Sequence, residues 1–111
     1  MGKKIVFLIR STPYRDLNNY EAMRASIALY DHDVTVAWMS DGVFYPLKSS
    51  DKGNTQPILR LFKDLNIRLL VDADELALRG YSGQDIIPEV ELVPHDEAIE
   101  ALVQADSVLS F

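Results

Sequence analysis

The stretch Ile67–Gly80, with the sequence IRLLVDADELALRG, decides the fold that we expect for this chain. Its apolar run Leu69–Val71 shows no alternation with polar residues, which is typical of a strand covered on both faces. We therefore expect a buried strand over Ile67–Val71 and a short helix over Asp74–Leu78, ended by the Arg-Gly pair. Asp72 falls between them, at the carboxyl end of the strand, where open parallel α/β sheets bind ligands.

Strands and helices alternate outward from this stretch along the whole chain. This order predicts a parallel or mostly parallel five-stranded sheet between helix layers, a three-layer α/β/α sandwich forming one domain over residues 1–111. We expect the Ile67 strand near the centre of the sheet and the second and fourth strands nearer its edges. The expected strands are Lys3–Ile9, Asp33–Met39, Ile67–Val71, Glu89–Val93 and Ser107–Phe111.

The composition excludes several classes of protein. The 111 residues are 48% hydrophobic and 25% charged, as in ordinary globular proteins. No apolar run approaches the roughly 20 residues that cross a bilayer, and no secretory signal is visible, so we expect no membrane contact and a cytoplasmic location. The absence of cysteine excludes disulfides and thiol chemistry in this chain. We expect no cofactor and no metal ion, because His32 and His95 lack metal-ligand spacing.

Charge is divided unevenly between the two halves of the sequence. Residues 1–71 hold ten basic and seven acidic residues, whereas residues 72–111 hold one basic and ten acidic residues. The resulting charges of +3 and −9 argue against nucleic-acid binding by this chain alone, which requires excess Lys and Arg. The acidic half is either a solvated surface or one side of an electrostatically complementary subunit contact.

The carboxyl ends of parallel strands meet at one edge of a sheet, which we call the rim. The loop after the first strand lacks glycine, so no phosphate-binding loop is present there. Its polar residues could bind a small anion or could simply cap backbone groups. These candidate binding residues are Arg10, Ser11, Thr12 and Arg15, and the loops expected at the rim are Ser11–Arg15, Asp41–Tyr45, Asp72–Asp74 and Pro94–Asp96.

Acidic residues also lie at the rim. Asp41 follows the second strand, and Asp72 forms an acidic cluster with Asp74 and Glu75. Such a cluster could hold Mg²⁺ or act in acid–base chemistry. Alternatively, Asp74 caps the helix and Asp72 accepts hydrogen bonds from the backbone N–H groups at the helix start. We favour this structural interpretation, because the sequence places no second carboxylate cluster and no histidine nearby.

Aromatic residues lie in or beside the expected loops. A small domain cannot bury all of them, and aromatic residues gathered near a rim indicate a partner surface. The alternative is that Trp38 and Phe44 belong to the core while the tyrosines lie flat on the surface. The candidate interface residues are Tyr14, Trp38, Phe44, Tyr45 and Tyr81.

Short motifs follow one another in order over the whole chain. They are Ser11-Thr12-Pro13, Asp41-Gly42-Val43-Phe44, Phe62-Lys63-Asp64-Leu65, Arg79-Gly80 and the terminal Asp106–Phe111. With these motifs the chain resembles the DsrE/DsrF-like sulfur-relay family, and within it the DsrF/TusC-like branch. The resemblance implies a three-layer α/β fold and assembly with like-folded DsrE-like or DsrH-like subunits, in which an E-type subunit carries a cysteine that accepts persulfide sulfur.

The family cysteine lies eight residues before the glycine of the Arg-Gly motif, a position that Asp72 occupies in this sequence. A carboxylate cannot form a persulfide, because that chemistry requires a polarizable thiolate. Our first hypothesis is therefore a non-catalytic DsrF/TusC-like subunit that assembles with a cysteine-bearing partner. The alternatives are a stand-alone homo-oligomer that binds a small anion or metabolite at the rim, and an enzyme that uses Asp72 as a base or Mg²⁺ ligand.

Overall fold

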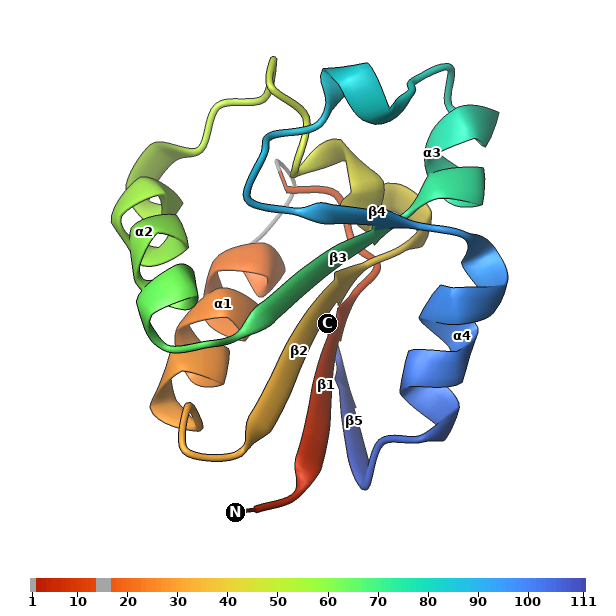
Figure 1. Ribbon diagram of the computed structural model, residues 1–111. Coiled ribbons are helices and arrows are strands. Elements are labelled where there is room, and N and C mark those ends of the chain that lie inside the picture. The colour runs from red at the N-terminus through yellow and green to blue at the C-terminus, as the bar shows by residue number, and fades with distance from the viewer. Residues whose placement is uncertain (1, 14–16) are drawn as a thin grey trace.

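The computed structural model describes residues 2–13 and 17–111, and in this part of the chain five strands form a single sheet (Figure 1). The strands are arranged in the order β4-β3-β2-β1-β5, and every neighbouring pair is parallel. The expected five-stranded parallel α/β fold is therefore confirmed. The strands are β1 (Lys4–Ile9), β2 (Asp33–Trp38), β3 (Arg68–Asp72), β4 (Glu91–Val93) and β5 (Ser107–Ser110).

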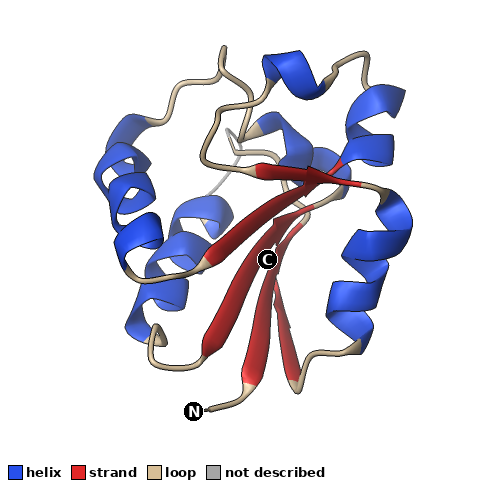
Figure 2. Cartoon of the chain, in the orientation of Figure 1, coloured by secondary structure: helices blue, strands red, loops and turns tan. Residues whose placement is uncertain are grey.

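Helices cover both faces of the sheet. The helices α1 (Asn18–Ala28) and α2 (Gln56–Asp64) pack on one face, and α4 (His95–Val103) packs on the other (Figures 1 and 2). The short helix α3 (Ala73–Leu78) follows β3 at the rim and contacts a 3-10 turn over Ser40–Phe44. None of the helices in the described ranges is long and apolar enough to span a bilayer.

The positions of two strands in the sheet differ from our expectation. The second strand, expected near an edge, is central, and β3 lies between it and the edge strand β4, whose edge position is confirmed. Large and small residues alternate along β2, as they do in a strand with one face exposed at a sheet edge. Ala37 is small but fully buried in the layer beneath α4, while Val36 and Trp38 are buried on the opposite face. The alternation along β2 is therefore one of side-chain size, and both faces of this strand are covered.

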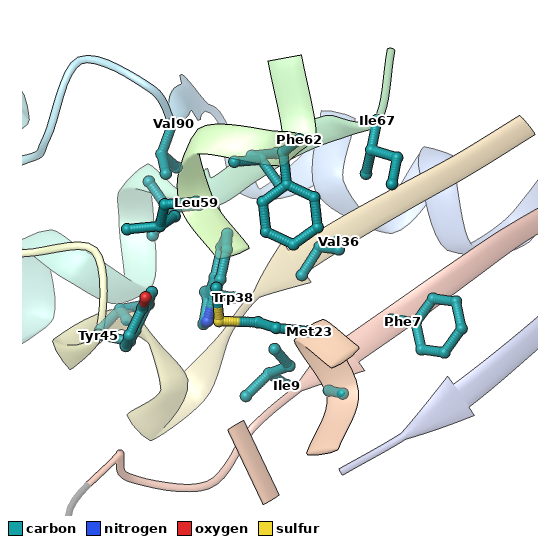
Figure 3. Close-up of a cluster of buried hydrophobic side chains, with 14 of the residues drawn as sticks. Phe7, Ile9, Met23, Val36, Trp38, Tyr45, Leu59, Phe62, Ile67 and Val90 are labelled. Atoms are coloured by element: carbon teal, nitrogen blue, oxygen red, sulfur yellow. The ribbon is translucent and has the colours of Figure 1, made fainter. Parts of the chain in front are cut away.

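Two apolar layers hold the fold together. The larger one lies between the sheet and α1 and α2 (Figure 3), and the smaller one lies between the sheet and α4. The two layers differ in size because α1 and α2 together cover one face of the sheet, whereas α4 covers most of the other face. The fully buried large side chains include Phe7, Ile9, Met23, Trp38, Tyr45, Phe62 and Leu70.

Trp38 and Tyr45 lie in the larger layer. The alternative that Trp38 belongs to the core is therefore confirmed, and the expectation that Tyr45 lies at the surface is wrong. Their exposed fractions are 0% and 2%, and their rings stack with centroids 5.3 Å apart (Figure 3). The indole Nε1–H donates to Asn19 Oδ1 at 2.8 Å, and the tyrosine hydroxyl pairs with Thr55 Oγ1. Burial raises the pKa of Tyr45 to about 12. The 3-10 turn after β2 causes the burial of Tyr45, because it returns this residue to the layer under α1 and α2.

Candidate functional site

Asp72 ends β3 and begins α3. Its side chain is fully buried, and its Oδ1 accepts hydrogen bonds from the backbone N–H groups of Asp74 at 3.0 Å and Glu75 at 3.1 Å. These are the donors that a helix start leaves without partners inside the helix. The hydrogen bonds expected from the helix start to Asp72 are therefore present. Asp74, which we expected at the cap, lies in the first turn, and Asp72 is the N-cap residue.

The second carboxylate oxygen of Asp72 faces a histidine. Asp72 Oδ2 lies 2.5 Å from His95 Nδ1, and His95 is the first residue of α4. The backbone N–H of His95 also donates to Asp74 Oδ2 at 3.2 Å. We call the first interaction the Asp72–His95 pair. The expectation that no histidine lies near Asp72 is wrong, because the turn from β4 into α4 brings together two residues 23 positions apart.

The pKa of His95 is raised above its ordinary value of 6.5. The hydrogen bond to Asp72 is the main cause, and the negative charge of Asp72 adds to it. Glu75 and Asp74 raise this pKa further, and partial burial of the imidazole opposes the increase. The imidazolium form of His95 is thus favoured by acidic groups from both β3 and α3.

This pKa shift predicts a pH-dependent stability. Because the folded-state pKa of His95 lies above 6.5, the pair stabilises the fold fully below about pH 6.5, and this contribution is lost as the pH rises through the raised pKa. We expect the stability difference between the wild type and His95→Gln to be largest in mildly acidic buffer and to shrink in alkaline buffer. Urea unfolding at a series of pH values measures it. A difference that stays constant or grows with pH would contradict the assignment.

A second cluster at the rim joins two of the sequence motifs. The guanidinium of Arg79 on the α3 side donates to Asp41 Oδ1 at 2.9 Å and to Glu75 Oε2 at 3.1 Å. Asp41, predicted as a binding residue, thus pairs with the Arg-Gly motif. Gly42, beside it, leaves no room for a side chain, since a Cβ there would press on the carbonyl group of Ile9. Gly42 therefore lets the turn after β2 pack against the end of β1. The Asp41–Arg79 pair joins the same turn to the end of α3.

The structure describes most of the remaining predicted residues. Arg10 is exposed, and its backbone N–H donates to the carbonyl of Phe111 at 2.8 Å. The side-chain oxygens of Ser11 and Thr12 are buried and have no hydrogen-bond partner within residues 2–13 and 17–111. Phe44 and Tyr81 are half-buried and meet edge to face, with ring centroids 6.2 Å apart. Two predicted site residues, Tyr14 and Arg15, lie outside the described residues.

Asp72, Glu75 and His95 offer side-chain ligand atoms that all lie within 4.8 Å of one another, a spacing that could suit a metal ion. Each side chain, however, already has partners in the protein. Asp72 binds two backbone N–H groups and the imidazole, and Glu75 pairs with Arg79. A divalent cation would have to displace these partners. We therefore assign the cluster to hydrogen bonding and not to metal ligation.

The comparison with known families agrees with this geometry, since the model of the DsrE/DsrF-like family matches residues 3–111. The chain belongs to the DsrE/DsrF-like family. The intracellular sulfur oxidation protein DsrF of Allochromatium vinosum is 29% identical over 131 residues, covering 98% of this chain and 96% of that protein. A TusC homologue of Vibrio parahaemolyticus is 28% identical over 116 residues, covering 97% and 98%. These relatives confirm the expected DsrF/TusC-like branch.

Solved structures share the DsrE/DsrF-like fold. The YchN protein of Escherichia coli matches with a TM-score of 0.83 and 28% identity, covering 98% of this chain and 99% of that one. A protein of unknown function from Methanobacterium thermoautotrophicum matches with a TM-score of 0.74 and covers 98% and 99%. At 17% identity, the second match supports the fold alone.

The N-cap role of Asp72 predicts a measurable loss of stability when its carboxylate is removed. Asp72→Ala leaves two backbone N–H groups and the His95 imidazole without their acceptor. We expect the free energy of unfolding to fall by about 2 kcal/mol, and by about half as much in Asp72→Asn, because asparagine also caps helices. Urea unfolding measures both losses, with the exposed Asp64→Ala as a control that should change little. Equal stability of Asp72→Ala and the wild type would contradict the capping role.

Proposed function

We propose that this chain is a DsrF/TusC-like subunit that carries no sulfur itself and assembles with a like-folded, cysteine-bearing partner in intracellular sulfur transfer. The observation that carries this proposal is Asp72. Its spacing from the Arg-Gly motif is the one at which the resemblance implies a cysteine, and the fold uses it as the N-cap of α3 and the partner of His95. With no cysteine elsewhere in the chain, a sulfur atom has no residue to which it can be transferred.

The relatives support the pathway part of the proposal. DsrF of Allochromatium vinosum is named for intracellular sulfur oxidation, and this chain aligns with nearly its whole length. Loss of the sulfur carrier in a chain that keeps the surrounding motifs fits a role in association. We place this role in the cytoplasm and assign no enzymatic activity to the chain on its own.

The surface supports the assembly part. Two strongly exposed apolar side chains, Leu78 at 81% and Val103 at 72%, lie on α3 and α4. The edge strand β5 adds Val108 and Leu109, each 43% exposed. All four lie in the acidic second half of the sequence, residues 72–111. A partner that presents apolar residues with a basic surround would complement the exposed side chains of α3 and α4.

Co-expression tests the assembly. We expect this chain to elute with a cysteine-bearing DsrE-like chain, with or without a DsrH-like chain, as one complex of defined mass in size-exclusion chromatography with light scattering. Leu78→Glu should weaken the complex. Leu61→Glu should not, because Leu61 is exposed on α2, on the other side of the sheet from α4. A chain that stays monomeric with every such partner would contradict the proposal.

One observation favours a second candidate function, a stand-alone protein that binds a small anion at the rim. The buried hydroxyl groups of Ser11 and Thr12, which have no partner among the described residues, could donate to an anion, with Arg10 nearby in sequence. In that case inorganic phosphate or sulfate should raise the melting temperature of the wild type, and Thr12→Val should lose the shift. An unchanged melting temperature over a wide range of anion concentrations would exclude this candidate.

A further inference from the structure

We propose that the Asp72–His95 pair is an acid–base site that exchanges a proton with a thiol presented at the rim by a partner chain. The inference rests on the proposed function but goes beyond it, because it gives the chain a chemical role in addition to association. His95 is the acid–base residue in this account, and Asp72 is the residue that positions it.

The geometry fixes the orientation and the tautomer of the imidazole. Asp72 Oδ1 is held by two backbone N–H groups at the start of α3, so the carboxylate cannot rotate freely. Since a carboxylate can only accept, its Oδ2 accepts a hydrogen bond from the Nδ1–H of His95. A carboxylate that binds one imidazole nitrogen leaves the other nitrogen to take up or release a proton, as in the Asp-His part of hydrolase triads.

The other nitrogen of this imidazole is available. Within the described parts of the chain, His95 Nε2 has no hydrogen-bond partner, and the side chain is 40% exposed. Asp74 and Glu75 on α3 face the ring together with Asp72 on β3, and Asp96 follows on α4. Arg79 offsets the charge of Glu75. The pair is therefore a preformed acid–base group at the rim, where parallel α/β proteins carry out chemistry.

The chemistry of the pair indicates the class of the reacting group. This chain has no cysteine, so the group that loses or gains the proton belongs to another molecule. A thiol, with a pKa near 8.5, lies within about two units of an imidazole and exchanges protons with it readily. A serine or threonine hydroxyl is a far weaker acid. A cysteine thiol is therefore the group that this site suits best.

The proton transfer fits a balanced sulfur transfer. His95 Nε2 takes the proton of the partner's thiol and becomes imidazolium. The thiolate attacks the outer sulfur of a donor protein persulfide, forming a new S–S bond and breaking the old one. The donor leaves as a thiolate and receives the proton back from the imidazolium. The net change moves one sulfur atom from the donor to the partner, and this chain ends as it began.

Thiol alkylation in the purified complex tests the inference. Because this chain has no cysteine, every thiol alkylated by iodoacetamide in a complex of the two chains belongs to its DsrE-like partner. We expect the wild-type complex to lower the apparent pKa of the partner's thiol by about one unit, and His95→Gln to slow alkylation at neutral pH roughly tenfold. Asp72→Asn should give an intermediate pH profile. Added imidazole should restore part of the rate in His95→Ala.

The controls separate this inference from the proposed function. His32→Gln makes the same change at the histidine that precedes β2, where the strands begin and away from the rim. This variant should leave the pH profile unchanged. An intact His95→Gln complex whose alkylation profile matches that of the wild type would overturn the acid–base site while leaving the proposed function standing. Failure of the wild-type chain to form any complex would overturn the proposed function, and the inference with it.

Discussion

Trp38→Ala is expected to lower the free energy of unfolding by about 4 kcal/mol, the largest loss that we predict for a single side chain here. Trp38 is fully buried on β2, stacks on Tyr45 and donates to Asn19. Its removal leaves a cavity between the sheet and α1 and breaks the hydrogen bond with a buried amide. Urea unfolding followed by circular dichroism measures the loss.

One further variant separates the packing of Trp38 from its hydrogen bond, and a second serves as a surface control. Trp38→Phe keeps most of the ring volume but removes the donor to Asn19, so we expect a loss of about 2 kcal/mol. Tyr30→Ala removes an exposed aromatic ring and should change little. A Trp38→Ala protein as stable as the Tyr30→Ala protein would show that Trp38 does not belong to the core.

Gly42→Ala is expected to destabilise the chain by about 3 kcal/mol and to lower its melting temperature by roughly 10 °C. A methyl group at position 42 would press on the carbonyl oxygen of Ile9 and lie 2.9 Å from its carbonyl carbon. Both groups are backbone, so the turn after β2 would have to move away from the end of β1. The displacement would also disturb the neighbouring Asp41–Arg79 ion pair.

Gly83→Ala is the matched control for this prediction. A Cβ at position 83 would approach only the end of the Leu92 side chain, at 2.9 Å, and Leu92 is partly exposed and able to rotate. We therefore expect a small change in melting temperature. Similar losses in the two glycine variants would contradict the close approach of Gly42 to β1.

The sequence was sufficient to predict the order of elements and the place of Asp72. Local patterns carry that information, since the unbroken apolar run of β3 and the polar residues after it are visible within a few positions. The same patterns left Trp38 open between core and surface, and they misplaced Tyr45 at the surface. The burial of Tyr45 depends on a 3-10 turn that returns the chain over the larger apolar layer, a tertiary arrangement that no local period encodes.

The contacts within the candidate site were hidden for a related reason. His95 meets Asp72 across 23 residues, and Arg79 meets Asp41 across 38. Each residue alone is an ordinary polar residue near the end of a helix or strand. Only the parallel order β4-β3-β2 brings the loops together, and the sequence gives that order weakly, as the misplaced second strand shows. The Gly-containing motifs were the one available signal for these contacts between distant loops, because a glycine after a strand can mark a close backbone approach.

Intact-mass spectrometry of the complex after exposure to a protein persulfide tests the central claim, that this chain takes part in sulfur transfer through association and not as a carrier. We predict that the cysteine-bearing partner gains the mass of one sulfur atom while this chain keeps its own mass and remains bound. A sulfur atom found on this chain, or a partner that takes up sulfur equally well without binding this chain, would contradict the account.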